Sequence, residues 1–251
     1  MSVAGKVVIV TGGAMGIGYA VCEHLAGQGA SVVVADRAGA ETAAAKIEAS
    51  GAVALAVGAD VSVERDVEAM VGATLDRFGR VDGLVNNAGI YSSLRPTPFE
   101  ALSAEEWRRV LDVNVVGVFL CCRAVVPAFR RQGGGRIVNI SSGVAFKGNP
   151  DMLHYVASKG AVVSMTRSLA TELGPDAILV NSVAPGLTLS EGLLQNPVLA
   201  GGVRDFGVRT RALRREMYPS DLVGAIAFFL GDAAAFVTGQ TLVVDGGAYY
   251  H

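Results

Sequence analysis

Tyr155 and Lys159 stand four residues apart in the stretch LHYVASKGAV, residues 153–162, whose composition suits a helix. Side chains at positions i and i+4 share one face of a helix, so this spacing would bring a phenol and an ammonium group together. A free tyrosine has a pKa of about 10, and lowering it to ~7 takes about 4 kcal/mol. One positive charge about 4 Å away supplies roughly that much at an effective dielectric constant near 20. The pair therefore suits a general base, although a half-buried ring beside a solvated lysine is the commoner explanation of the spacing alone.

A glycine-rich turn, TGGAMGIG at residues 11–18, follows directly on the first apolar run of the chain. Gly12, Gly16 and Gly18 would let the chain turn sharply from a strand into a helix, whose free N–H groups and positive dipole end suit a phosphate. The spacing is G-x-x-x-G-x-G rather than G-x-G-x-x-G. We predict a dinucleotide site here, with Met15 and Ile17 also in contact, and keep a glycine turn that serves packing alone as the alternative.

The second apolar run ends in Asp36, eighteen residues after Gly18. A carboxylate at this place accepts hydrogen bonds from the adenosine ribose hydroxyls and repels the additional phosphate of NADP. Arg37 follows and offers a positive charge that could bind that phosphate. Met15, however, occupies a position of the glycine loop where a basic residue would have helped to bind the phosphate of NADP. The balance favours NAD over NADP.

The composition is that of a globular protein, with 251 residues, 51% hydrophobic and 18% charged residues, and a formal net charge of -2. Nothing in this charge indicates a nucleic acid or an anionic membrane as partner. The apolar run before Thr11 is too short for a secretory signal of ~7–15 apolar residues. No stretch was expected to reach the ~18 apolar residues of a membrane span, so we predict a cytoplasmic protein. The cysteines and histidines have no metal-ligand spacing, and no metal is expected; they are Cys22, Cys121, Cys122, His24, His154 and His251.

Short runs rich in Val, Leu and Ile alternate with segments of helical periodicity along the whole chain. This alternation predicts a single α/β domain, residues 1–251, with a doubly wound parallel sheet and helices on both faces. The expected strands are 6–13, 31–36, 52–60, 82–89, 135–142, 177–186 and 240–247. The expected helices are roughly 16–28, 40–50, 63–78, 103–131, 152–174 and 219–231.

Asn114 interrupts the apolar stripe of the helix expected at 103–131, which begins with a capping box formed by Ser103 and Glu106. A buried amide costs free energy unless it finds hydrogen-bond partners. Asn114 either ties down a neighbouring strand or faces a wet, functional cavity, and the helix alone does not decide between them.

Several motifs, taken together and in this order, resemble the short-chain dehydrogenase/reductase family along essentially the whole chain. They are TGGAMGIG, NNAG at 86–89, Asn114, NISS ending at Ser142, YVASK, and APGLT at 184–188. The resemblance implies a Rossmann sheet of seven strands in the order 3-2-1-4-5-6-7. It also implies hydride transfer between NAD(H) and a secondary alcohol or ketone, and a homotetramer.

The resemblance assigns roles to individual residues. Tyr155 is expected to be the general acid/base, with Lys159, Ser142 and Asn114 as its partners; the asparagine in this family holds a water that links the lysine to solvent. The resemblance also implies cofactor contacts in addition to the glycine loop, Asp36 and Arg37. Asp60 and Val61 are expected at the adenine, and Asn87, Ala88 and Gly89 along the cofactor. Tyr155 and Lys159 are expected to contact the cofactor too, with Pro185, Gly186 and Thr188 at its nicotinamide end.

The substrate is expected outside the carboxyl ends of the strands, under a lid at about 187–218. The expected lining is mostly apolar and consists of Ser142, Val144, Phe146, Met152, Leu187 and Leu193. Two alternatives to an alcohol dehydrogenase or carbonyl reductase stay open. An NADPH-dependent 3-oxoacyl-[acyl-carrier-protein] reductase is disfavoured because Gly133 and Asp176 stand where such relatives carry basic residues. A non-catalytic dinucleotide-binding regulator is disfavoured because all four catalytic positions are filled.

The expected lid contains five arginines, Arg204, Arg209, Arg211, Arg214 and Arg215, against one acidic residue in the same window, Asp205. A solvated helix face or a subunit contact explains such a cluster most simply. The alternative is that one or two arginines turn inward and hold an anionic group of the substrate, for which the planar guanidinium is well suited.

Overall fold

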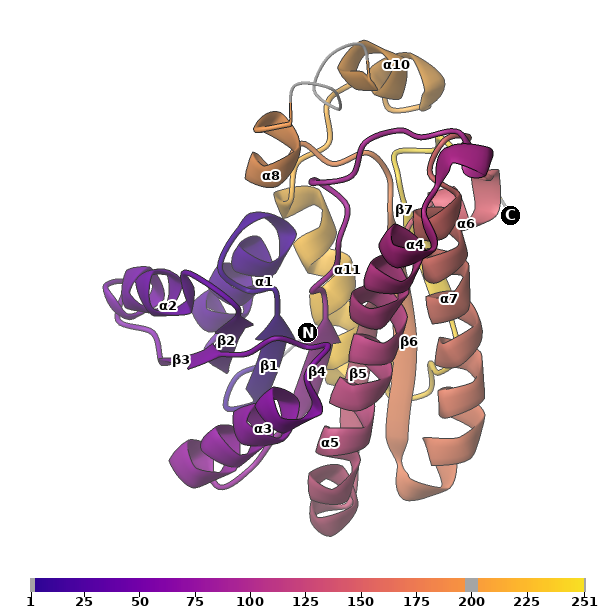
Figure 1. Ribbon diagram of the computed structural model, residues 1–251. Helices are drawn as coiled ribbons and strands as arrows, with labels where there is room; N and C mark the ends of the chain where they lie inside the picture. The colour runs from indigo at the N-terminus through magenta and orange to yellow at the C-terminus, as the bar shows by residue number, and fades with distance from the viewer. Residues whose placement is uncertain (1–2, 197–202, 251) are drawn as a thin grey trace.

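A computed structural model of the protein describes residues 3–196 and 203–250. Seven strands form one parallel sheet in the order β3-β2-β1-β4-β5-β6-β7, as predicted (Figure 1). The strands are β1 (Val7–Thr11), β2 (Ser31–Asp36), β3 (Ala54–Gly58), β4 (Gly83–Asn86), β5 (Gly135–Ile140), β6 (Ile178–Pro185) and β7 (Thr241–Val244). The order reverses direction between β1 and β4, and at such a point the carboxyl ends of the strands leave a crevice for a ligand.

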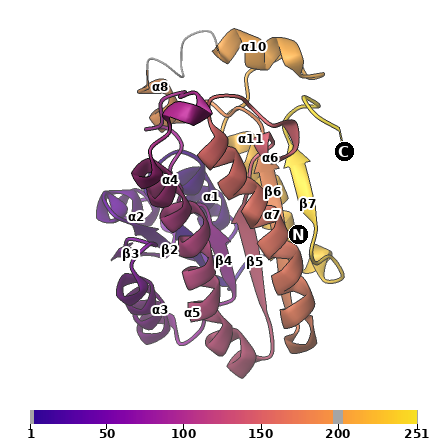
Figure 2. The same cartoon turned by 45° about the vertical axis from the view of Figure 1, so that its right-hand side comes forward.

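The helices cover both faces of this sheet. They are α1 (Gly16–Gly27), α2 (Ala40–Glu48), α3 (Glu64–Phe78), α4 (Ala104–Leu111), α5 (Gly117–Gln132), α6 (Val144–Lys147), α7 (Leu153–Leu173), α8 (Glu191–Leu194), α10 (Val203–Thr210) and α11 (Ser220–Leu230). Helices α1, α2 and α11 pack on one face, and α3, α5 and α7 on the other. Figures 1 and 2 both place α8 and α10 beyond the carboxyl ends of the strands, over the crevice.

The continuous apolar character of the strands follows from this double covering. Along β1, Val8 and Val10 belong to the core under α1 and α11, whereas Ile9 points into the core under α5 and α7. All three are fully buried. Successive side chains of a strand point to opposite faces, so both sets must be apolar when helices cover both faces. The three cysteines, Cys22, Cys121 and Cys122, are buried and unbridged, as expected of small core residues.

The helix expected at 103–131 is interrupted. It begins as predicted, because the Ser103 hydroxyl accepts from the Glu106 backbone N–H at 3.0 Å. Residues Asp112–Val116 then form a π-helical turn between α4 and α5. Such turns insert one residue into the hydrogen-bond ladder and often mark functional sites. Here the turn contains Asn114.

The stretch Ala104–Gln132, which spans α4, the π turn and α5, is long and apolar enough to cross a membrane by length and composition. The expectation that no stretch would reach this limit was therefore wrong. Half of its most apolar window is buried inside the protein, which is the behaviour of a core helix. Its contacts with α3 and β5 account for that burial.

Candidate active site

A cavity of about 560 Å³ opens at the carboxyl ends of β1, β2, β3, β4, β5 and β6. It brings together most residues that the sequence analysis selected from motifs far apart in the chain. From the glycine loop, Gly12, Met15, Gly16 and Ile17 line it. Gly18 does not reach its surface, because it lies behind the loop.

The glycine loop is fixed to the end of β4 by a short network. The Asn87 side chain donates to the backbone oxygens of Thr11 and Gly12 at 3.0 and 2.9 Å, and the Thr11 hydroxyl accepts from the Asn87 and Ala88 N–H groups. A Cβ atom at Gly18 would lie 2.0 Å from the Gly12 oxygen, so no larger residue fits there. Gly12 and Gly16 adopt positive φ angles of 63° and 56°, which glycine tolerates best. The loop thus leaves the start of α1 open to a phosphate, and it fits a dinucleotide.

The end of the cavity at the carboxyl ends of β2 and β3 is acidic. It is lined by Asp36, Arg37, Asp60 and Val61. The Asp36 carboxylate accepts from the Ala14 N–H at 3.1 Å, which couples it to the glycine loop. The Arg37 guanidinium lies 3.6 Å from the Asp60 carboxylate. Burial acts to raise the pKa of Asp60, but hydrogen bonds from Ser62 and the Arg37 charge outweigh it and hold that pKa below its ordinary value. Asp60 therefore remains charged and partly compensates the charge of Arg37.

Tyr155 and Lys159 enter the cavity from the first turns of α7, and Ser142 enters from the end of β5. The Lys159 Nζ lies 5.9 Å from the centre of the Tyr155 ring and donates to the Ile140 oxygen at 2.8 Å. Burial lowers the pKa of Lys159 to about 8. Burial, with a smaller contribution from Tyr91, raises the pKa of Tyr155, and a hydrogen bond with Ser142 acts in the opposite direction. The protein alone thus keeps the phenol protonated, and the proposed lowering of its pKa by Lys159 stays a prediction.

Asn114 is fully buried and does not line the cavity. Its side-chain oxygen accepts from the Ile90 N–H at 2.7 Å, and its amide donates to the Ile90 oxygen and the Ser158 hydroxyl. These bonds tie the π turn to the segment after β4 and to α7. A Cβ at Gly89 would lie 3.2 Å from the Asn114 oxygen and 3.6 Å from the Lys159 Nζ. Asn114 therefore lies on the same side of Gly89 as Lys159, and its hydrogen bonds hold the surrounding backbone; its role toward a water stays a prediction.

The other residues that the resemblance implies as cofactor contacts also line the cavity, and their contact with a cofactor stays a prediction. Asn87, Ala88 and Gly89 line the cavity after β4, and Pro185, Gly186 and Thr188 line it after β6. A Cβ at Gly186 would lie 2.7 Å from the Cβ of Asp245, so glycine is required by close packing behind the wall.

Only part of the predicted substrate wall is present. Val144 and Leu187 line the cavity with Ser142, but Phe146, Met152 and Leu193 do not. Phe146 points away and stacks on Tyr249, with ring centres 5.9 Å apart. Met152 packs behind Tyr155 in a small core, and Leu193, on α8, is buried in a cluster with Leu189. The expectation that these three residues line the substrate end is therefore corrected. The Phe146 ring faces away from the cavity, whereas Met152 and Leu193 pack behind its lining.

Other lining residues were missed, among them Tyr91, Lys147 and Asn149. The Tyr91 ring lies 4.8 Å from that of Tyr155 at an angle of 37°. Tyr91 follows the NNAG motif by two residues. Its closeness in sequence to a predicted strand end could have indicated that it lies at the cavity. Lys147 follows Ser142 by five residues.

The arginines of the predicted lid behave differently from one another. Arg211 is buried, lines the cavity, and donates to the Leu187 and Arg215 backbone oxygens, both at 3.1 Å. Arg209, Arg214 and Arg215 are exposed, and Arg215 pairs with Asp221. Residues 197–202 and the side chain of Arg204 lie outside the described residues. One arginine of the cluster therefore does turn inward.

Comparisons with known proteins agree with this geometry. The family model described as "Enoyl-(Acyl carrier protein) reductase" matches residues 12–249. The short-chain reductase protein NovJ of Streptomyces niveus is 39% identical over 96% of this chain and 93% of its own length. A 3-oxoacyl-[acyl-carrier-protein] reductase of Synechocystis sp. is 39% identical over 96% of both chains. The crystal structure of 3-ketoacyl-(acyl-carrier-protein) reductase from Brucella melitensis complexed with NADH matches with a TM-score of 0.90 and 40% identity, covering 98% of this chain and 99% of that chain.

The fold and the cavity define a dinucleotide-binding oxidoreductase with a Rossmann sheet. The chain belongs to the short-chain dehydrogenase/reductase family.

Proposed function

We propose that the protein interconverts a secondary alcohol and a ketone with NAD(H), and that Tyr155 is the general acid/base. One observation carries the proposal: Ser142, Tyr155 and Lys159 meet in the same cavity as the glycine loop. Six strand ends contribute to this cavity, so the arrangement has no simpler explanation in packing.

The side chains suit proton transfer at a carbonyl or carbinol oxygen. A nicotinamide cofactor, when bound, accepts or supplies the hydride. The Tyr155 hydroxyl gives a proton to the carbonyl oxygen during reduction and takes it back during alcohol oxidation. The Ser142 hydroxyl donates to the same oxygen as negative charge develops on it. Lys159 places a positive charge near the phenol, and this charge stabilises the phenolate.

The acidic end of the cavity supports NAD rather than NADP. Asp36 lines it at the end of β2, where a carboxylate repels a 2′-phosphate. Arg37 is the basic residue of that end, and its charge is shared with Asp60 at 3.6 Å. Replacing Asp36 by Ala should narrow the preference for NADH over NADPH, measured as the ratio of their kcat/KM values.

Reduction of a 3-oxoacyl thioester on a carrier protein is the second candidate, and the names of the Synechocystis and Brucella proteins favour it. The chemistry at Tyr155 would be the same. Against it, Gly133 and Asp176 replace basic residues, and Asp176 pairs with Arg130 at 2.7 Å. That pair reduces the positive charge available to an acidic carrier.

A homotetramer in the cytoplasm, with no nucleic acid or membrane partner, forms part of the proposal. Exposed apolar side chains support assembly, including Phe119 on α5, Phe236, and Leu242 on β7. Light scattering coupled to size-exclusion chromatography measures the assembly directly.

The decisive experiment compares initial rates with NADH and NADPH on neutral ketones, on free oxo acids and on a 3-oxoacyl carrier protein. Absorbance at 340 nm reports each reaction. Turnover of small ketones or oxo acids with NADH supports the first candidate, whereas turnover confined to the carrier-bound substrate with NADPH replaces it by the second. No oxidation of either nucleotide with any of these substrates would contradict both.

A further inference from the structure

The charges that line the cavity are divided between its two ends. One end, at the carboxyl ends of β2 and β3, contains Asp36, Arg37 and Asp60. At the end near Ser142 and Leu187, the charged residues of the described lining are Lys147, Lys159 and Arg211, all cationic. The substrate end therefore presents positive charge, and within the described residues no carboxylate lies in its wall.

Lys147 lines this end of the cavity and is paired with a buried carboxylate outside the lining. It ends α6, five residues after Ser142, and its Nζ lies 3.8 Å from the Asp245 carboxylate. Asp245 is 3% exposed, and its Oδ1 accepts from the Gly247 and Ala248 N–H groups at 2.9 and 3.0 Å. Its Oδ2 has no hydrogen bond and is left for the ammonium group. The Lys147 side chain is 32% exposed, lines the cavity, and makes no hydrogen bond to a described residue.

Arg211 adds a second, fixed charge. Its residue is 6% exposed, and backbone oxygens of Leu187 and Arg215 hold its two terminal nitrogens. Its Nε is buried without a partner. Neutral carbonyl oxygens orient a guanidinium but do not cancel its charge. The wall therefore keeps positive charge, which Asp245 beside Lys147 and Asp221 near Arg211 offset in part from outside the lining.

We propose that the substrate carries a carboxylate, which binds Lys147 while its carbonyl or hydroxyl group lies at Tyr155 and Ser142. The substrate class is then a small oxo acid and the corresponding hydroxy acid, and this rests on the proposed function. A cavity of about 560 Å³ that must also take a dinucleotide favours a small anion over a long acyl chain. Asp245 is a positioning residue in this arrangement: it orients Lys147 and does not touch the substrate. The competing explanation is that Lys147 only neutralises Asp245.

The test measures kcat/KM with NADH for a matched pair, 3-oxobutanoate and methyl 3-oxobutanoate, in wild type, Lys147→Met, Lys147→Arg and the control Lys46→Met. Lys46 is exposed on α2, far from the cavity lining. Loss of a charge-assisted hydrogen bond should lower kcat/KM for the acid by roughly tenfold or more, while the ester changes less than about twofold. Lys147→Arg should restore most of the loss, and Lys46→Met should match wild type. A wild type that prefers the ester, or a Lys147→Met variant that slows both compounds equally, overturns the proposal.

A binding measurement separates this inference from the proposed function. Calorimetric titration of 3-oxobutanoate into the protein saturated with NAD, which cannot reduce the ketone, should show affinity that falls roughly tenfold in Lys147→Met. If the acid binds in this Lys147-dependent way but no carbonyl compound is turned over, the carboxylate site stands and the proposed reaction fails. If neutral ketones are reduced and the acid binds no better to wild type than to Lys147→Met, the reaction stands and the carboxylate site is wrong.

Discussion

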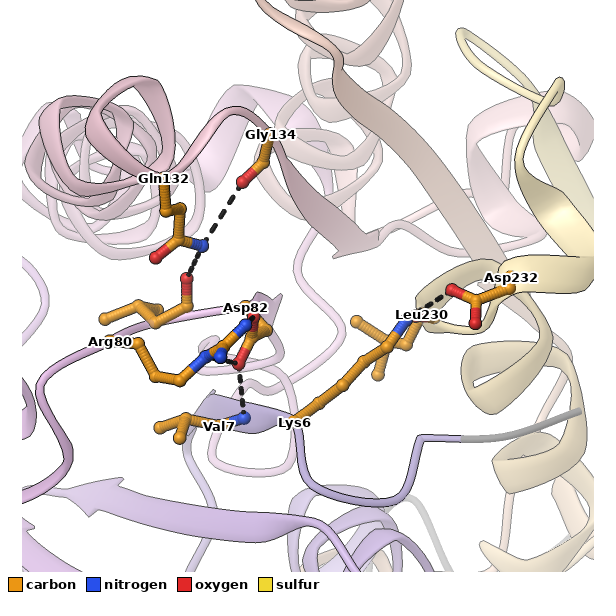
Figure 3. A network of polar contacts seen from close by, with 9 residues as sticks. Lys6, Val7, Arg80, Asp82, Gln132, Gly134, Leu230 and Asp232 are labelled. Atoms are coloured by element: carbon orange, nitrogen blue, oxygen red, sulfur yellow. Dashed lines mark hydrogen bonds and ion pairs between the residues drawn. The ribbon is translucent and has the colours of Figure 1, made fainter.

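The polar side chains before β1 and β4, at the amino edge of the sheet, are paired more completely than those around the cavity at its carboxyl edge. At the amino ends of the strands, the side chains shown in Figure 3 are paired with one another or with backbone groups. Asp82 accepts from the Val7 N–H at 2.8 Å and from the Arg80 guanidinium at 2.9 and 2.6 Å. Lys6 donates to the Leu230 oxygen and to Asp232 at 3.0 and 2.9 Å. These groups lie at or near the surface and close the ends of β1 and β4.

At the carboxyl ends, polar groups are buried with incomplete pairing. Lys159 is 5% exposed and has one backbone oxygen as hydrogen-bond acceptor. The Asp245 Oδ2 and the Arg211 Nε have no hydrogen-bond partner. Burying a polar group without partners costs about 1–3 kcal/mol. The contrast teaches that the amino edge serves folding, whereas the carboxyl edge gives up stability to keep groups ready for a ligand.

The largest effect should follow from removing one hydroxyl at the carboxyl edge. Tyr155→Phe keeps the buried ring and its contact with Tyr91 but removes the group that transfers the proton. We expect kcat to fall by about 10²–10⁴-fold, as is typical of lost acid–base catalysis. The dissociation constant for NADH, measured by fluorescence titration, should stay within about threefold of wild type. Tyr19→Phe on α1 is the control, and turnover of Tyr155→Phe within tenfold of wild type would remove Tyr155 from its role.

The glycine loop offers a matched pair within one helix. Gly18→Ala would place a Cβ 2.0 Å from the Gly12 oxygen and 2.6 Å from the Asn87 amide, so the loop must move. We expect NADH binding to weaken by more than tenfold, with a lower melting temperature. At Gly27, in the last turn of α1, an added Cβ meets nothing within 4 Å, and Gly27→Ala should leave binding unchanged and stabilise the helix slightly. Equal effects of the two substitutions would contradict the close packing of the loop.

The buried lysine should give the stability of the protein a pH dependence in the alkaline range. Burial lowers the pKa of Lys159 from 10.5 to about 8. Between these values the unfolded chain binds a proton that the folded chain does not, so the free energy of unfolding rises with pH. This contribution is present above the unfolded pKa and is lost as the pH falls through the folded one. Relative to Lys159→Met, wild type should therefore gain about 2 kcal/mol between about pH 7 and pH 9.5, by urea unfolding. A difference that stays constant over this range would show that Lys159 is not desolvated as described.

Much of this architecture could be predicted because its signals are local. The strands at 31–36 and 135–140 and the glycine loop follow from runs of residues that are contiguous in sequence. The π turn could not be predicted, because it accompanies the bonds of Asn114 to Ile90, a residue 24 positions away. Periodicity within one segment carries no information about such a contact.

The candidate site also contains residues whose positions could be predicted from the local sequence and residues whose positions depend on distant contacts. Motif residues such as Ser142 and Tyr155 line the cavity, because a strand end and a helix start fix their positions. The segment between them contains a four-residue helix and positive φ angles at Gly148 and Asp151, of 68° and 61°. These turns direct Phe146 away from the cavity and bring Lys147 to it. Side-chain direction after such turns depends on what packs against them, here Asp245 and Tyr249, from the other end of the chain.

The smallest expected effect belongs to the amino edge and tests whether that edge serves folding alone. Asp82→Ala removes the acceptor of the Val7 N–H, and Val7 is 4% exposed, so a buried donor loses its partner. We expect the free energy of unfolding at neutral pH to fall by about 1–2 kcal/mol, with kcat and KM unchanged. Asp82→Asn, which keeps an acceptor oxygen, should recover most of the loss. Arg80→Ala should cost less than about 0.5 kcal/mol, because the Arg80 side chain is 58% exposed and a surface ion pair contributes little. If Arg80→Ala costs as much as Asp82→Ala, the ion pair rather than the backbone bond holds this edge; if either variant lowers kcat more than twofold, the two edges are coupled and the contrast between them fails.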